Sequence, residues 1–112
     1  MALIGQDYTV IMGLIKNRNC PQDILLDLSE HNDIDIRWNI ARNPNSPEEV
    51  LLILSKDRHS EVRTNVAKNP NCPKDILLTL LKDKRIYVKT HAAETLQFLD
   101  LQSKLDMKIN RK

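Results

Sequence analysis

The chain has 112 residues, one domain's length, and its 41% hydrophobic and 29% charged residues indicate a globular protein and exclude a disordered or fibrous one. Seventeen Lys and Arg against fifteen Asp and Glu give a net charge of +2, which by itself requires neither a nucleic acid nor an acidic partner. Only two glycines and many Leu and Ile residues argue against a sandwich or barrel. Because there is neither an apolar run of transmembrane length nor a signal peptide, we expect a small helical domain in the cytoplasm without membrane contact.

A repeat of 26 residues runs through the chain without a gap. Asn17, Asn43 and Asn69 begin three successive units, and the second and third units share 12 of their 26 residues. Other positions in register are Pro21, Pro47 and Pro73, Leu25, Leu51 and Leu77, and Ala41, Ala67 and Ala93. The sequence therefore predicts a single helical-repeat domain over residues 1–112, with a partial repeat 7–16, full repeats 17–42, 43–68 and 69–94, and a C-terminal helix 95–110.

Each unit is expected to form two short helices. In the middle unit, Ser46 is expected to cap the first helix, with Pro47 in its first turn and Glu49 completing a capping box. The second helix is expected over about residues 61–68 and should end at Asn69-Pro70, because Asn tolerates a left-handed C-terminal position and Pro cannot continue a helix. Helices this short are not stable alone, so the units must stack. The predicted fold is all-α, a short α-solenoid.

The two ends of the chain fit the same pattern. Residues 7–16 match the second helix of a unit. After Glu94 the Asn-Pro stop is replaced by Thr95-Leu96, so the last helix is expected to run on toward Ile109 and to cap the array. One face of this extension is apolar and would cover the last unit or form a homodimer; it comprises Phe98, Leu101, Leu105 and Ile109.

The repeated motif resembles the leucine-rich repeat variant family, a relative of HEAT-type helical repeats. The residues that carry the resemblance are Asp57, Val62-Arg63, Val66-Ala67, Asn69-Pro70, Pro73 and Leu77-Leu78. The resemblance implies a curved, right-handed helical stack in which one helix of each unit is partly a 3₁₀-helix, and it implies a binding scaffold rather than one fixed activity. His31 replaces the motif's aspartate, Arg18 its proline and Lys89 its arginine, so the units are not expected to make identical polar contacts.

A basic residue recurs once per unit as Arg37, Arg63 and Lys89. If the units stack, these side chains form a basic ladder that could bind a phosphate backbone or an acidic protein surface. The alternative is structural, since Asp57 and Asp83 could pair with the arginines and tie neighbouring units together. A second basic row, with a solvated surface as its alternative, comprises Lys16, Arg42 and Lys68.

Trp38 occupies a position that is Thr64 and Thr90 in the other units, so the repeat itself does not require an aromatic residue there. It is either an anchor for a partner or a packing residue against the N-terminal helix near Tyr8. The predicted partner-binding surface is the row of second helices: Arg37, Trp38, Asn39, Arg63, Thr64, Asn65, Lys89, Thr90 and His91.

No pattern of catalysis or metal binding is present. Cys20 and Cys72 precede the first helix of their units, at the position of Ser46, and are interpreted as free thiols with a capping or packing role. The three histidines fall at different repeat positions without metal-ligand spacing. We therefore expect a non-enzyme without cofactor or metal that binds another protein. The alternatives are nucleic-acid binding through Arg37, Arg63 and Lys89 and a self-associating structural subunit.

Overall fold

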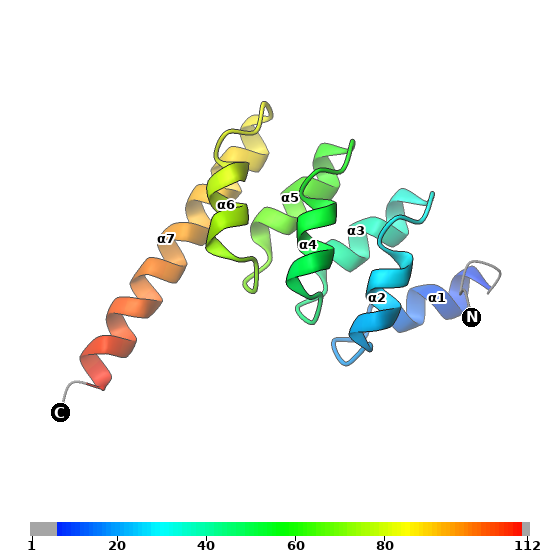
Figure 1. The fold of residues 1–112 in the computed structure, drawn as a ribbon, viewed down its shortest axis with the longest axis horizontal. Coiled ribbons are helices and arrows are strands. Elements are labelled where there is room, and N and C mark those ends of the chain that lie inside the picture. The colour runs from blue at the N-terminus through cyan, green and yellow to red at the C-terminus, as the bar shows by residue number, and fades with distance from the viewer. Residues whose placement is uncertain (1–6, 111–112) are drawn as a thin grey trace.

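The computed structural model describes residues 7–110, which form seven α-helices and no strand (Figure 1). The helices are α1 (Tyr8–Ile15), α2 (Gln22–Leu28), α3 (Ile34–Arg42), α4 (Glu48–Leu54), α5 (Ser60–Lys68), α6 (Lys74–Leu80) and α7 (Ile86–Ile109). The all-α prediction is therefore confirmed over this part of the chain. The partly 3₁₀ helix that the family resemblance implied is not found there, because all seven elements are α-helices.

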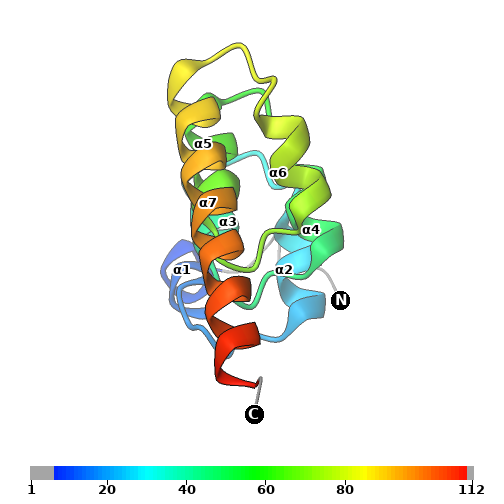
Figure 2. The ribbon, with the colours of Figure 1, turned by 90° about the vertical axis from the view of Figure 1, so that its left-hand side faces the viewer.

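The helices lie in two rows (Figure 2). One row contains α1, α3, α5 and α7, each packed on the next, and the other contains α2, α4 and α6. The molecule measures 52 × 36 × 18 Å, and its smallest dimension corresponds to two packed helices at an interaxial distance of about 10 Å. We refer below to the first-helix row (α2, α4, α6), the second-helix row (α1, α3, α5, α7) and the helix pairs α2–α3, α4–α5 and α6–α7.

The hydrophobic core lies between the two rows and follows the spacing of apolar residues in each helix. In α4, Val50, Leu51 and Leu54 are fully buried, whereas Leu52 points outward and is half exposed. In α5, Val62 and Val66 are buried at a spacing of four residues, which places both on one face. These seven- and nine-residue helices are too short to be stable in isolation, so burial against neighbouring helices holds them.

The predicted capping role of Ser46 is wrong. The first residues of α4 receive no side-chain cap, and Pro47 is the residue that precedes the helix. The Ser46 hydroxyl instead donates to the Ile40 carbonyl at 2.7 Å, near the C-terminus of the preceding helix α3. Ser46 is buried, and its hydroxyl is a second donor to this carbonyl, which also accepts from the Asn43 amide at 3.1 Å. The Ser46 hydroxyl therefore binds the C-terminal end of α3 and does not cap the N-terminus of α4.

The prediction of left-handed asparagines at the helix ends is also wrong. Asn43 and Asn69 have φ of −68° and −71° with ψ of 122°, an extended backbone, and no described residue has positive φ. Each side chain donates to the C-terminal end of the preceding helix in the second-helix row. The Asn69 amide donates to the carbonyls of Ala41 at 2.9 Å and Asn43 at 3.0 Å, and its oxygen accepts from the Asn71 amide at 2.9 Å.

The Asn43 side chain repeats these contacts one unit earlier. It donates to the carbonyls of Ile15 at 2.7 Å and Asn17 at 3.0 Å and accepts from the Asn45 amide at 2.8 Å. The asparagine of the repeat is thus a bond between neighbouring helix pairs, and both residues are almost completely buried. An extended backbone aims the side chain at the previous pair, which a left-handed residue would not do.

The expected continuation of the last helix past Glu94 is confirmed. Helix α7 runs without interruption for 24 residues to Ile109, and its C-terminal half projects beyond the other helices (Figure 1). Thr95 stands where Asn43 and Asn69 stand in the other units, and its hydroxyl donates to the Ala67 carbonyl at 2.6 Å. One bond to the previous helix pair is therefore kept while the backbone remains helical.

The asparagine contacts can be tested by substitution. Asn69→Ala removes two donors from buried carbonyls and one acceptor, so we expect a loss of about 2–3 kcal/mol in the free energy of unfolding, measured by urea denaturation followed by circular dichroism. Asn17→Ala is the matched control, because within residues 7–110 the exposed Asn17 side chain accepts from the Asn19 amide alone. Equal losses in the two variants would contradict this role of Asn69.

Candidate interaction surface

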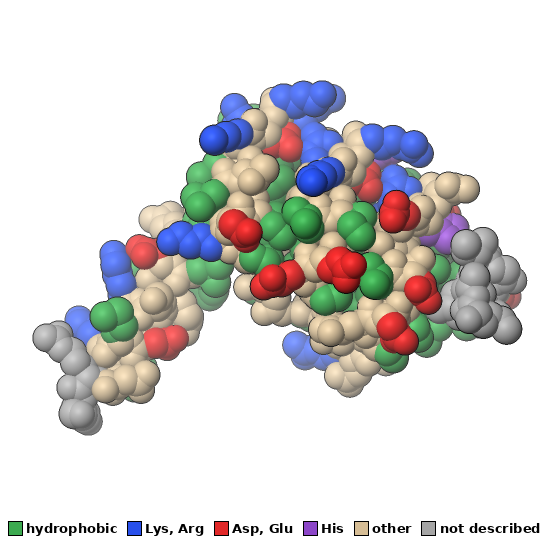
Figure 3. All heavy atoms as spheres, in the orientation of Figure 1, with side chains coloured by type: hydrophobic (Ala, Val, Ile, Leu, Met, Phe, Trp, Pro, Cys, Tyr) green, Lys and Arg blue, Asp and Glu red, His purple; other side chains and the backbone are tan. Residues whose placement is uncertain are grey.

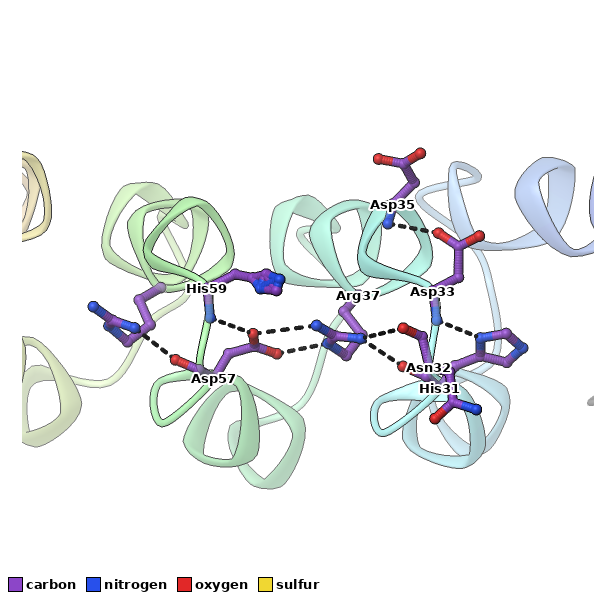
Figure 4. Close-up of polar contacts among 8 residues, drawn as sticks. His31, Asn32, Asp33, Asp35, Arg37, Asp57 and His59 are labelled. Carbon is purple, nitrogen blue, oxygen red and sulfur yellow. Dashed lines mark hydrogen bonds and ion pairs between the residues drawn. The ribbon is translucent and has the colours of Figure 1, made fainter.

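Arg37 is held in a fixed position between two helix pairs (Figure 4). Its Nη1 donates to the carbonyls of His31 at 2.8 Å and Asn32 at 2.9 Å, in the turn that precedes its own helix α3. On the other side its Nε donates to the Asp57 carboxylate at 2.7 Å, in the turn between α4 and α5. The arginine is only 6% exposed, so the turn carbonyls and one carboxylate satisfy a guanidinium that solvent hardly reaches.

Arg63 makes equivalent contacts one unit later, with one turn carbonyl in place of two. Its Nη1 donates to the Asp57 carbonyl at 2.6 Å, and its Nε donates to the Asp83 carboxylate at 2.7 Å. Arg63 is 8% exposed. Asp57 therefore binds Arg37 through its side chain and Arg63 through its backbone, and one chain of bonds crosses three helix pairs. The ion-pair alternative for these two arginines is the arrangement that the structure contains.

His31 takes over part of the aspartate's role in the first unit. The Nδ1 of His31 accepts from the Asp33 amide at 3.0 Å, as the Asp57 carboxylate accepts from the His59 amide at 2.9 Å (Figure 4). In the preceding helix α1 the position of Arg37 is occupied by the buried Ile11. His31 thus preserves the hydrogen bond within the turn. At the position where the other units have an arginine, α1 has the apolar Ile11, so no aspartate is needed to pair with it.

The ion pairs shift the acidity of both aspartates in the same direction. Burial acts to raise the pKa of Asp57, but the hydrogen bonds from Arg37 and the His59 amide outweigh it and hold that pKa below its usual value. The pKa of Asp83 is lowered in the same way, with burial opposed by hydrogen bonds from Arg63 and the Arg85 amide. Both carboxylates are therefore ionised at neutral pH.

Lys89, the third member of the predicted basic ladder, differs from the two arginines. It is exposed on α7 and forms no ion pair with residues 7–110. The ladder is therefore not a continuous basic surface, since two of its three cations are buried and neutralised. Partner contact by Arg37 and Arg63 would require breaking their ion pairs.

Trp38 lies half-buried on the second-helix row, between two surface hollows. The first hollow, between α1 and α3, is lined by Tyr8, Met12, Ile34, Asp35, Trp38, Asn39 and Glu61. The second, between α3 and α5, is lined by Trp38, Arg42, Asn65, Lys68, Asn69 and Pro70. The Arg42 guanidinium lies 5.1 Å from the centre of the indole ring, a cation–π contact. Trp38 packs on the hydrophobic core and also borders open surface. Its role as an anchor for a partner stays a prediction.

The remaining predicted site residues differ in burial and in the hydrogen bonds that their side chains make. The Asn65 side chain is buried and donates to the Trp38 carbonyl at 3.1 Å, so it belongs to the framework. Asn39 donates to the Asp35 carbonyl at 2.8 Å, and His91 lies 3.2 Å from the Glu94 carboxylate. Thr64 is half-buried, while Thr90 is exposed.

Charge is distributed unevenly along the second-helix row. Acidic Asp35 and Glu61 lie in the first turns of α3 and α5 and are exposed. Exposed basic residues lie at the opposite ends of α1, α3 and α5: Lys16, Arg42 and Lys68. This order complements the helix dipoles, and it makes the surface dipolar, with about 10 Å between the acidic and basic ends of one helix.

The two cysteines are buried and not joined. Burial raises the pKa of the Cys72 thiol to about 12 and also raises that of Cys20. A raised pKa keeps the sulfur as an unreactive thiol at neutral pH, which favours packing. Each Sγ lies 3.7 Å from the carbonyl of the following proline, Pro21 or Pro73, so neither sulfur caps the helix that follows.

No helix within residues 7–110 has the length and apolar character needed to cross a membrane. Compared with protein-family models, with curated proteins and with solved structures, the chain gives no match. The resemblance to the leucine-rich repeat variant family therefore rests on the repeated motif alone.

The buried ion pairs predict a sharp difference between equivalent positions. Arg63→Ala leaves the Asp83 carboxylate buried without its cation, and we expect a loss of about 3–5 kcal/mol in the free energy of unfolding by urea denaturation. Lys89 occupies the same repeat position as Arg63 but is exposed. Lys89→Ala is therefore expected to change the free energy of unfolding by less than about 0.5 kcal/mol. Similar effects of the two substitutions would refute the assignment of Arg63 to the framework.

The lowered aspartate pKa values predict acid sensitivity with a defined sign. A carboxylate whose pKa is depressed by folding stabilises the protein fully above its unfolded pKa of about 3.9, and this contribution is lost as the pH falls through the lower folded value. The stability difference between the wild type and Asp57→Asn should therefore be constant from pH 7 to 5 and shrink below about pH 4.

This pH dependence is measured by urea denaturation across that range. Asp100→Asn serves as the control, because Asp100 forms only an exposed pair with Lys104 on α7. A stability difference for Asp57→Asn that does not change with pH would show that the Asp57 charge contributes nothing to the fold.

Proposed function

We propose that the chain is a short right-handed α-solenoid that binds other proteins and has no catalytic role. It would contain about three 26-residue two-helix repeats, a partial N-terminal repeat and a capping extension of the last helix. Support for the arrangement comes from the two helix rows and from ion pairs and asparagine bonds that recur at the repeat period. Membership of the leucine-rich repeat variant family is part of the same proposal.

The observation that carries the binding proposal is Trp38. A partly buried tryptophan bordered by two hollows and stacked with an arginine is typical of residues that dominate the energy of protein interfaces. The binding surface, which we call the Trp38 surface, comprises Trp38, Asn39, Arg42, Thr64 and Lys68. Arg42 and Lys68 replace the buried Arg37 and Arg63 as the basic contacts of this surface.

The chemistry of the surface favours a partner with acidic and apolar groups side by side. An apolar side chain would enter a hollow beside the indole ring, while a carboxylate would form charge-assisted hydrogen bonds with Arg42 or Lys68. The acidic residues Asp35 and Glu61 lie about 10 Å from this basic end and would repel a phosphate backbone. The dipolar charge therefore favours a protein over a nucleic acid.

The sequence contains one tryptophan, so its fluorescence reports directly on the proposed surface. We expect Trp38→Ala combined with Arg42→Ala to reduce capture of binding proteins from a cell extract at least tenfold while the helical circular dichroism is retained. The matched control is Leu78→Ala with Lys74→Ala, which removes an exposed apolar and an exposed basic residue from α6 in the first-helix row. A purified partner should shift the Trp38 emission of the wild type.

Two outcomes would contradict this proposal. Undiminished capture by the double variant would exclude the Trp38 surface. Micromolar binding of labelled nucleic acid with a steep salt dependence, abolished by reversing the charges of Lys16, Arg42 and Lys68, would favour the nucleic-acid alternative instead.

Self-association remains a second proposal, favoured by the projecting part of α7. Phe98, Leu101 and Leu105 are each more than half exposed on one face of this helix. Burial of such a stripe against a second copy would give a dimer whose population rises with concentration, which sedimentation equilibrium measures. A monomer at millimolar concentration would exclude it.

A further inference from the structure

One edge of α7 exposes residues whose counterparts in α3 and α5 are buried. Ala41 and Ala67 are fully buried, and Arg37 and Arg63 nearly so, because the next helix pair covers them. Their counterparts Ala93 and Lys89 are exposed. We call this surface the C-terminal edge; it comprises Ile86, Lys89, Thr90 and Ala93.

The two internal interfaces show what fits such an edge. At each of them the next helix pair places an aspartate, Asp57 or Asp83, against the arginine of the edge at 2.7 Å. The aspartate lies in the turn between two helices, and the helix after the turn packs along the edge. The C-terminal edge keeps a cation at the arginine position and adds apolar surface at Ile86, which is 68% exposed.

The charge around the C-terminal edge is positive. Lys89 is joined by three exposed cations of the turn between α6 and α7: Lys82, Lys84 and Arg85. The one acidic residue of that turn, Asp83, is paired with Arg63. Figure 3 shows basic side chains gathered at the end of the molecule where the α4–α5 and α6–α7 turns lie. An incoming carboxylate would meet four cations there.

We propose that the C-terminal edge binds a helical hairpin of a partner protein that presents an aspartate or glutamate in the turn between its two helices. The hairpin packs its second helix along α7 over Ile86 and Ala93 and places its carboxylate against Lys89, as α4–α5 and α6–α7 do within the chain. This docking site is separate from the Trp38 surface and does not depend on it.

A second copy of this chain fits the edge less well. The position that aligns with Asp57 and Asp83 is His31 in the first unit and Gly5 ahead of α1. Neither residue supplies a carboxylate to Lys89. The chemistry of the edge therefore selects a different protein with an acidic turn.

The proposal can be tested with a probe taken from the chain itself. A copy of residues 43–68, which carries Asp57 in its turn, is attached to the C-terminus of the full chain by a flexible Gly-Ser linker. The projecting part of α7 spans about 22 Å, and about 20 linker residues have a root-mean-square reach of about 25 Å. Tethering brings the hairpin to an effective concentration in the millimolar range, and the hairpin is expected to become helical on the edge as the short helices of the chain do on their neighbours.

The expected result is a set of amide chemical-shift changes at Ile86, Lys89 and Ala93 in the nuclear magnetic resonance spectrum. Asn in place of Asp57 in the hairpin copy, or Lys89→Glu in the chain, should reduce the bound population at least tenfold. Lys89→Arg should increase it several-fold, because arginine occupies this position at both internal interfaces. Trp38→Ala should leave the shifts unchanged, so this test fails or succeeds independently of the Trp38 surface.

Three results would overturn the proposal: absence of shifts at the C-terminal edge in the tethered protein, shifts that persist in Lys89→Glu, or shifts confined to Phe98, Leu101 and Leu105. Sedimentation of the chain without the hairpin tests whether a second copy of the chain occupies the edge instead. Concentration-dependent association that Lys89→Glu abolishes would identify a second copy, and not a separate acidic hairpin, as the occupant of the edge.

Discussion

The bond between an arginine and an aspartate 20 residues further along the chain is the constraint on which the rest of the structure depends. Helices of seven to nine residues must be held by their neighbours, and apolar packing by itself is not directional. Arg37 and Arg63 add direction, because each is bound by the turn before its own helix and by the aspartate of the next helix pair. The guanidinium can satisfy both sides at only one relative position of the two pairs.

The asparagine contacts work with the ion pairs from the other end of the second helices. Between α2–α3 and α4–α5, Arg37 binds Asp57 near the first turn of α3, whereas Asn69 reaches Ala41 and Asn43 at the C-terminal end of α3. These two helix pairs are thus joined at two points about one helix length apart, which opposes rotation of one pair on the other. At Thr95 a single hydroxyl bond replaces the asparagine contacts, and this permits α7 to continue as one helix beyond the array.

The same contacts decide which surfaces remain for binding. A residue that ties helix pairs together is buried, so Arg37, Arg63 and Asn65 belong to the framework although the repeat pattern also made them candidates for recognition. Trp38 and Arg42 lie on the outer face of the same helix, where Arg42 is exposed and Trp38 is only partly buried. Lys89 is also available, since no described residue pairs with it. The proposed binding residues and the residues that join the helix pairs therefore occupy neighbouring positions on the same helix.

The sequence by itself determined the repeat period, the helical class and the extension of the last helix, because apolar spacing and the Asn-Pro stops are local properties of the chain. It also raised the ion pairing of Asp57 and Asp83 as one of two alternatives. Only the tertiary structure decided that Arg37 and Arg63 are buried in those pairs, that Ser46 serves the preceding helix, and that Asn43 and Asn69 reach the previous pair. These contacts join residues as far as 28 positions apart, and their geometry depends on how the helix pairs stack, which no local pattern records.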